Sequence, residues 1–502
     1  MARRTYSKRF SFFLYLYLII STLIYQSARA DLSSLAKNDP YPVFSTLGRD
    51  DAYLLTKQQL YYKDEELYPE KHNRVGLSIT PFGQNASRGK SIKGQPCPVP
   101  FCDLTLIPSP PACDIPCPDE ADVPLGDLTG RPGMIALLYG ALPQGHETLP
   151  GGPTGYLSAA YKEFFGLPFG IQSNGGNIDP LQNFGFFSFP IEYRKRGLRF
   201  ELSALFATNF GVRIQTGVSS IRQVVERVIN KTCDPTITTE CTSHFKPVTP
   251  IITTESVNAL LMDQLDNITT QMGTDISNII QTSCEEVRLN MFWRQIFNMN
   301  EESEYDWAHF LLIPYFEASG SFSPNKPRNP NQLFAAPFGN NGHTSVGFTT
   351  GINFDFIETI ELGGEVGFTH FFKRDFCNYP VPNSKYQTTL FPFKTNVSIQ
   401  PGNNWYFCAR IAAYHFLGNL SMNFEWFVLD HKQDSIKLET PDPAFLPRLL
   451  ENTTTFKTKF ANASLNYDIA PNIGIGFLWQ IPFSQRNAYR SSTIMGGVNF
   501  TF

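Results

Sequence analysis

Beyond its first thirty residues, this chain of 502 residues lacks any long apolar run. The longest later stretch, Phe310 to Phe316, is interrupted by Pro314, whereas a helix needs about 18 or more apolar residues to cross a bilayer. Charged residues make up only 17% of the chain, and its formal net charge is −4. A strongly basic surface, which nucleic-acid partners require, is therefore absent from the composition. The sequence after residue 30 predicts neither a membrane-spanning helix nor a nucleic-acid-binding protein.

The first thirty residues have the pattern of a secretory signal peptide. Four basic residues lie within the first nine positions, the apolar run Phe12 to Tyr25 follows, and Ala28-Arg29-Ala30 is a small-x-small cleavage signal. The apolar run is short for a membrane anchor, which is the alternative interpretation. We predict a cleaved signal peptide over residues 1–30, export of the remaining chain, and a polar lead-in over residues 31–72.

Many later segments alternate between apolar and small or polar residues. Val346 to Phe354, Ile360 to Phe368 and Leu420 to Val428 each do so with a period of two, which indicates strands with two unlike faces. Short links near 356–358, 417–419 and 470–471 alternate with long links at 323–342, 373–403, 432–452 and 483–490. Short turns on one side and long loops on the other are typical of transmembrane β-barrels, in which the short turns are periplasmic.

The last twelve residues, Ser491 to Phe502, support the same interpretation. Apolar residues and glycine share one face of this segment, which ends on a terminal phenylalanine. The segment resembles the closing strand of Gram-negative outer-membrane β-barrel proteins. The resemblance implies an assembly signal at Val498, Phe500 and Phe502 that is read by the barrel-assembly machinery. It also implies residence in the lipid bilayer of the outer membrane of a Gram-negative-type bacterium.

The predicted fold class is therefore all-β, a transmembrane antiparallel up-and-down β-barrel over residues 73–502. Thirteen alternating segments can be counted, but bacterial single-chain barrels have an even number of strands. Adding Val287 to Phe297 gives about fourteen strands, and omitting Val75 to Phe82 gives the alternative of twelve. We favour fourteen. The links Lys195–Gly197 and Ala207–Asn209 are of hairpin length, and the second resembles the later short turns, which is the reason for favouring fourteen. A change of phase near Phe460-Ala461 predicts a bulge.

Two inserts interrupt the predicted barrel. Over residues 220–285, apolar residues such as Ile221, Val224 and Val228 recur at intervals of three and four, which predicts a helical insert in the lumen, as a cap or at the periplasmic mouth. Residues 84–132 form a loop rich in cysteine and proline. We predict two disulfides among the four cysteines of this loop, for which a zinc site is the weaker alternative, and a local pair between the two cysteines of the helical insert. No metal is expected. The disulfide candidates are Cys97, Cys102, Cys113, Cys117, Cys233 and Cys241.

The alternation also predicts which charged residues face the lumen. A charge on the lipid face costs about 2–4 kcal/mol for arginine or lysine at the bilayer midplane, so an inward position is favoured. In one interpretation these residues set a transverse field across an aqueous pore; in the other they pair and fill a plugged barrel. The lumen-facing candidates are Arg199, Glu201, Arg213, Glu317, Glu361, Glu365, Arg410 and Glu425.

Enzymatic activity is not predicted. His343 and Ser345 are the one neighbourhood that suggests catalysis, but they match no family signature, and Glu361 and Glu365 are separated by about 13 Å at the usual strand rise. Eight Asn-x-Ser/Thr sites raise the rival hypothesis of a secreted eukaryotic glycoprotein. Chance is the better explanation, because Asn499 lies in the closing strand, and asparagine and threonine are ordinary lumen residues. The leading hypothesis is a channel or transport protein for small solutes, without a cofactor. The alternative is a surface-exposed structural or adhesion barrel with a plugged lumen. The permeant and the oligomeric state are left open.

Overall fold

The structure is a computed structural model. It describes residues 75–90, 122–124, 187–225 except 208, 229–230, 275–299, 310–382 except 325, 333 and 357–359, 391, and 393–502 except 453, 471 and 487. Three predictions lie outside the described residues: the signal peptide, the 31–72 lead-in and all six disulfide candidates. Within the described residues no helix has the length and hydrophobicity needed to span a bilayer.

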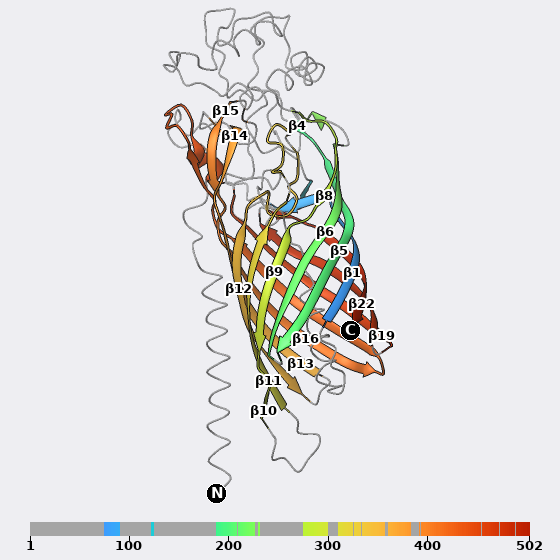
Figure 1. The fold of residues 1–502 in the computed structure, drawn as a ribbon. Coiled ribbons are helices and arrows are strands. Elements are labelled where there is room, and N and C mark those ends of the chain that lie inside the picture. Colours follow the sequence, from blue (N-terminus) through green and yellow to red (C-terminus); the bar gives the residue numbers. More distant parts are fainter. Residues whose placement is uncertain are drawn as a thin grey trace, which may run out of the picture. The chain divides into compact units, whose positions relative to one another are not determined.

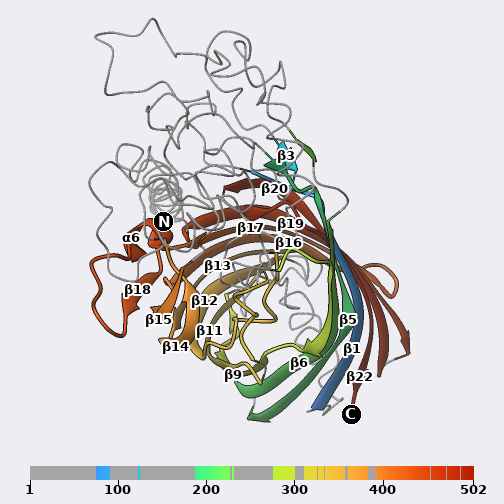
Figure 2. The same ribbon diagram turned by 90° about the horizontal axis from the view of Figure 1, so that it is seen from above.

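The described strands form one closed antiparallel β-barrel of twelve wall positions (Figures 1 and 2). Each strand is hydrogen-bonded to the next, and β9 returns to β11 to close the ring. In ring order the strands are β11 (Phe310–Phe322), β12 (Ser345–Phe356), β13 (Ile360–Phe371), β16 (Asn404–Leu417), β17 (Leu420–His431), β19 (Phe456–Ala470), β20 (Ile473–Arg486), β22 (Ser492–Thr501), β1 (Val75–Ala86), β5 (Ile191–Ala207), β6 (Phe210–Val225) and β9 (Val287–Arg294).

The predicted count of fourteen wall strands is wrong, and the alternative of twelve fits. Fourteen hydrogen-bonded segments are present, but β8 (Ile279–Cys284), β9 and β10 (Phe297–Asn298) occupy one wall position as an interrupted strand. The predicted turn at Lys195–Gly197 also fails, because β5 runs through it without a break. The alternative of twelve was reached by omitting Val75 to Phe82, and that omission is wrong. These residues belong to β1, a wall strand that pairs with both β22 and β5.

The predicted helical insert over residues 220–285 is wrong at both of its ends. Residues 220–225 continue β6 as a strand, and residues 279–284 form β8. The last residues of β6 pair with β5 on one side and with β8 on the other. Two hydrogen-bonded ladders therefore outweigh the helical spacing of the local sequence. The middle of the insert, residues 231–274, lies outside the described residues.

Short and long connections alternate around the barrel as the sequence indicates. The links 208–209, 357–359, 418–419 and 471–472 join strands at one end, whereas 87–190, 226–278, 323–344, 372–403 and 432–455 join them at the other. The terminal strand β22 pairs with β1, and Phe502 exchanges backbone hydrogen bonds with Val75. An irregularity does lie at the predicted place, but the extra residue is on the neighbouring strand: Lys459 pairs with Ser484 and Phe460 with Pro482, so Phe483 of β20 is the bulged residue and β19 keeps its phase.

The outer face of the barrel is an apolar band. On β12 the outward side chains from Val346 to Phe356 are uncharged, and ten residues at about 3.3 Å each, tilted by about 40°, span about 25 Å. This height matches the hydrocarbon band of outer-membrane barrels. The band has a sharp edge on β5 and β6: the outward pair Leu198 and Val218 is apolar, and the next outward pair is Arg196 and Ser220.

Exposed aromatic residues lie near both ends of the band. Girdles of aromatic residues are typical of the two membrane–water interfaces of such barrels. Near the short-turn end they are Phe206, Phe210, Phe356, Phe416 and Tyr467; near the long-loop end they are Phe322, Phe372, Trp405 and Phe483.

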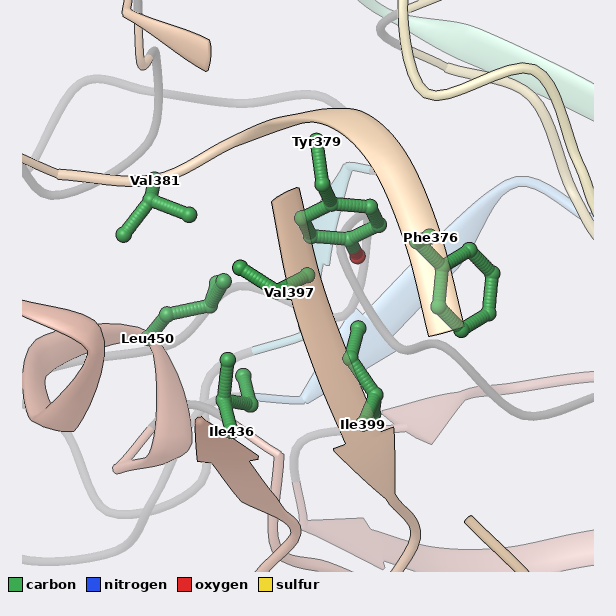
Figure 3. Packing of buried hydrophobic residues seen from close by; sticks show 7 residues of the cluster. All are labelled: Phe376, Tyr379, Val381, Val397, Ile399, Ile436 and Leu450. Atoms are coloured by element: carbon green, nitrogen blue, oxygen red, sulfur yellow. The ribbon is translucent and has the colours of Figure 1, made fainter. Parts of the chain in front are cut away.

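A second hydrophobic core lies in the long loops. The sheet β14 (Arg374–Pro380), β15 (Lys394–Gln400) and β18 (Ser435–Leu438) packs with the short helix α6 (Pro447–Glu451), and Figure 3 shows the side chains between them. Val397 is fully buried in this core. We call this unit the cap sheet. Its buried core is that of a water-soluble fold, in contrast to the barrel with its apolar outside. The remaining described strands are β2 (Arg88–Lys90), β3 (Asp122–Pro124), β4 (Phe187–Ser188), β7 (Ile229–Asn230) and β21 (Ala488–Tyr489).

Candidate functional site

The candidate site is the interior of the barrel, which is polar. Inward positions alternate with the lipid-facing ones, and all eight charged residues singled out from the sequence are buried on the inner side. Their side chains are not exposed to the lipid face, which a charge occupies only at a cost. The residues are Arg199, Glu201, Arg213, Glu317, Glu361, Glu365, Arg410 and Glu425.

Three carboxylates surround one guanidinium on the wall formed by β13, β16 and β17. Arg410 lies 3.2 Å from Glu425, 3.5 Å from Glu365 and 3.6 Å from Glu361. Strand register explains the arrangement. Arg410 is directly opposite Glu425 on β17 and opposite Gly363 on β13, with Glu361 and Glu365 two residues to either side of that glycine. Four residues that are scattered in the sequence thus meet at one point. We call them the Arg410 cluster.

Neutral side chains add hydrogen bonds to the cluster. Tyr315 donates to Glu365, and Tyr414 donates to Glu361 at 3.4 Å. Asn462 donates to Glu425 at 3.1 Å. Buried carboxylates are tolerated when such donors compensate for lost water, so the surrounding tyrosines and asparagines are part of the site.

Glycines allow large side chains to lie along the inner wall. Gly367 is directly opposite Tyr406 on the neighbouring strand, and a Cβ atom at this glycine would overlap the Tyr406 ring. The ring therefore crosses Gly367, and its hydroxyl reaches Thr349 one strand further on. Tyr315 crosses Gly351 in the same way on its way to Glu365. Both tyrosines are consequently held against the wall rather than across the lumen.

A second charged group lies on the wall formed by β1, β5 and the break between β8 and β9. Glu285 accepts from Arg199 at 2.8 Å and from Lys195 at 2.7 Å. The Arg199 guanidinium also stacks over the Phe82 ring, 4.2 Å from its centroid, a favourable cation–π arrangement. In a ring of twelve, β5 is six positions from β16. This group therefore lies across the barrel from the Arg410 cluster.

The remaining candidates also have polar partners. Arg213 pairs with Glu317 across the intervening strand β9. Glu201 accepts from Gln215 at 2.8 Å, and Gln215 accepts from Asn290 at 3.3 Å. Each of these groups therefore has a polar partner close by on the wall.

Sequence reasoning missed Lys195 and Glu285. Lys195 was assigned to a turn, and Glu285 lay at the edge of the supposed helix. Both Glu285 and Glu286 are buried because the break between β8 and β9 turns two consecutive side chains inward. The change of sequence period between 279 and 287 was the available signal, but it does not reveal the direction of the two side chains.

The long loop 323–344 contacts the neighbouring part of the long-loop mouth, near β5, β6 and β9. The backbone N–H of Ala336 donates to Gln223 of β6 at 2.9 Å, and Phe334 packs on Phe189 with 5.6 Å between the ring centroids. Gly339 contacts Glu286, with only 3.1 Å available for a Cβ atom, and it has a positive φ of 49° that favours glycine. Figure 2 shows the golden trace of this loop inside the outline of the ring. We call residues 323–344 the mouth loop.

His343 anchors the end of the mouth loop. Its Nδ1–H donates to the Phe372 carbonyl at 3.0 Å, and its ring packs on Phe376. Burial lowers the pKa of this imidazole, although the hydrogen bond to Phe372 opposes that effect. Ser345, the other residue of the suspected catalytic pair, instead shares a 2.7 Å hydrogen bond with Ser321. The two residues thus have separate partners and do not form a nucleophile–base pair.

The described residues contain no group of three or more histidine, cysteine, aspartate or glutamate side chains arranged to hold a metal ion. Within the part of the chain that the structure describes, Cys377 and Cys408 form no disulfide. Val498, Phe500 and Phe502, the proposed assembly signal, lie at the end of the closing strand β22, and Phe502 is largely exposed.

A closed antiparallel barrel with an even number of strands, an apolar outer band and a polar interior is the architecture of outer-membrane β-barrel proteins. No protein family and no curated protein sequence matches the chain. Among solved structures, an outer-membrane channel from Pseudomonas putida F1 is 6% identical with a TM-score of 0.41, and the match covers 86% of this chain and 97% of the channel.

Two further similar structures are a toluene transporter and a porin. The toluene transporter TodX from Pseudomonas putida is 8% identical with a TM-score of 0.27, over 93% of this chain and 99% of TodX. The KdgM porin is 10% identical with a TM-score of 0.24, over 62% of this chain and 98% of the porin. These likenesses carry no argument about function.

Proposed function

We propose that the protein is a channel or transport barrel for small solutes in the outer membrane of a Gram-negative-type bacterium. The observation that carries this proposal is the polar interior, in which Tyr315 and Tyr406 lie along the wall over glycines. An interior designed only for packing would favour side chains that interdigitate across the lumen. Charged and polar groups fixed on the wall are instead suited to solutes that cross in an aqueous path.

The topology proposed for the membrane follows from the connections. The short turns and the C-terminus lie on the periplasmic side, and the mouth loop and cap sheet face the exterior. The signal peptide directs export, and Val498, Phe500 and Phe502 present the assembly signal to the barrel-assembly machinery. In this arrangement a solute meets the cap sheet and the mouth loop before it reaches the Arg410 cluster.

A second candidate is a surface-exposed structural or adhesion barrel with a plugged lumen. Two observations favour it: the interior charges are almost completely buried, and the long loops build a cap sheet with its own hydrophobic core. A folded external unit of this kind is suited to binding a cell or another component of the envelope.

Conductance separates the two candidates. The full chain, refolded in detergent and added to a planar lipid bilayer, is expected to give discrete conductance steps. Folding is checked beforehand by the heat-dependent shift in gel mobility that folded barrels show. Protein that is folded and inserted but does not conduct would overturn the channel and leave the structural barrel.

A further inference from the structure

The outer face of the barrel carries a group of cations where β17, β19 and β20 leave the apolar band at the long-loop end. Lys457 on β19 lies directly opposite Arg486 on β20, and Lys459 lies one outward row closer to the band. Lys432 directly follows β17 and pairs with Asp430 at 3.3 Å. We call Lys432, Lys457, Lys459 and Arg486 the basic patch.

The basic patch has a surplus of positive charge. Within the described part of the chain, Asp430 is the one carboxylate among the charges that act most strongly on Lys457, and the others are the three remaining cations of the patch. Four positive charges against one negative charge leave a formal balance of +3. Like charges directly opposite each other on neighbouring strands are unfavourable, so the facing pair Lys457 and Arg486 favours an anion beside it.

The cations of the patch are accessible from outside the barrel. The Lys432 side chain is 60% exposed, and the other three side chains are partly exposed at outward positions. Among the residues described, Lys457, Lys459 and Arg486 form no salt bridge with a carboxylate. An anion that approaches the outer face can therefore reach them.

A similar arrangement recurs on β5 and β6, again at the long-loop end. In both places a row with one cation and one serine comes first beyond the band, and a row with two facing cations follows. On β5 and β6 these rows are Arg196 with Ser220 and Arg194 with Arg222. Glu192 forms a salt bridge with Arg194, so the basic patch has the larger surplus. On the described wall strands, every outward lysine or arginine lies at this end.

Apolar side chains adjoin the patch on the side of the band. Lys459 is opposite Val428, and the next outward pair toward the band is Trp426 with Ala461. Trp426 is 37% exposed, and Phe483 at the bulge of β20 is 53% exposed. A lipid can therefore lay its acyl chains along these apolar side chains while its headgroup lies against the cations.

We propose that the basic patch is a binding site for the phosphate groups of anionic lipids at this membrane–water boundary. Ammonium and guanidinium groups are well suited to bind phosphate, and each basic side chain near an anionic membrane surface favours it by roughly fivefold. In the proposed topology the long loops are external, so the ligand is a phosphate-bearing lipid of the outer leaflet. Because the patch lies outside the lumen, the site goes beyond the proposed channel.

The test uses the full chain with Trp426 as its only tryptophan, refolded into mixed vesicles of phosphatidylcholine and phosphatidic acid. Either one lipid or the other is brominated in its acyl chains, so the quenching of Trp426 reports which lipid lies beside the patch. We expect phosphatidic acid to bind at least roughly fivefold more tightly than phosphatidylcholine. The preference should decrease as KCl is raised, because salt screens exposed charges.

Two double variants of this protein locate the effect. K457Q/K459Q should reduce the preference to roughly twofold or less, since it removes two of the four cations. K326Q/K437Q is the matched control, because it removes the same charge from exposed positions outside the barrel wall, and it should keep the preference. All proteins are first checked for heat-modifiable gel mobility, and Arg486→Gln carries the test if K457Q/K459Q does not fold.

The outcomes separate the lipid site from the channel. A preference that is lost in K457Q/K459Q and kept in K326Q/K437Q would support the site. Equal binding of the two lipids by the parent protein, or the same preference in both double variants, would overturn it. Absence of conductance would overturn the proposed channel but leave the lipid site standing, because the quenching of Trp426 does not depend on an open lumen.

Discussion

At the scale of single residues, Arg410 is the position on which the inner wall depends most. Among the described residues it is the one basic side chain that contacts all three buried carboxylates of its cluster. Removing one partner of a buried ion pair is much more costly than losing an exposed pair, because the other charge is left without compensation.

We therefore predict that Arg410→Gln lowers the free energy of unfolding by about 3–5 kcal/mol. Arg222→Gln, at an exposed outward position of β6, should change it by less than about 0.5 kcal/mol. Denaturant unfolding in lipid vesicles, followed by tryptophan fluorescence, measures both variants. Equal stabilities would show that the carboxylates do not need the guanidinium.

Gly367 provides a second test at this scale. Gly367→Ala places a methyl group into the ring of Tyr406, and we expect it to cost about 1–3 kcal/mol through overpacking. Gly83→Ala is the control, since a Cβ atom there has no neighbour within 4 Å. The same unfolding measurement distinguishes them, and two indistinguishable variants would refute the close approach of Tyr406 to the wall.

At the scale of elements, the mouth loop has a built-in dependence on pH. The pKa of His343 is lowered in the folded state by burial, so the unfolded loop takes up a proton first. The stabilising contribution is present above the ordinary histidine pKa of about 6.5, and it is lost as the pH falls from there through the folded pKa.

We expect amide hydrogen exchange in residues 334–344 to accelerate between pH 7.5 and pH 5, after correction for the intrinsic rate. His343→Gln should remove this dependence, because glutamine does not titrate. Strand β12, which follows the loop, serves as the internal reference. Unchanged protection of the loop in the wild-type protein would contradict the prediction.

The cap sheet should unfold independently of the barrel. Val397→Asp buries a carboxylate in an apolar core and should make residues 372–403 sensitive to protease, because a buried unpaired charge is strongly unfavourable. Heat-modifiable mobility of the barrel should remain. Lys437→Asp, on the exposed side of β18, is the matched control; loss of the barrel in the Val397 variant would show that the two units fold together.

The elements also show how far the sequence could be used for prediction. Strands such as β12 and β17 were predictable because lipid on one face and a polar interior on the other impose strict alternation. The interrupted strand β8–β9 and the extension of β6 were not, since their hydrogen bonds come from distant segments. The cap sheet was interpreted as loops for the same reason: β15 pairs with β18 far along the chain.

The candidate site was likewise predictable only in part. Inward positions such as Arg410 and Glu425 follow from the period of two. That Glu361 and Glu365 both reach Arg410 depends on strand register, which the sequence does not provide. Spacing along one strand suggested that these two glutamates were too far apart to act together, and the arginine between them on the neighbouring strand is what joins them.

At the scale of the whole molecule, the account depends on an apolar outer band in contact with lipid. The most direct measurement is fluorescence quenching by lipids brominated deep in their acyl chains. Trp426 and Trp479 lie at outward positions on β17 and β20, 37% and 44% exposed. Variants that retain only one of them, refolded into vesicles, are expected to be strongly quenched. Emission that is insensitive to brominated lipid would show that protein, not the membrane, covers this face.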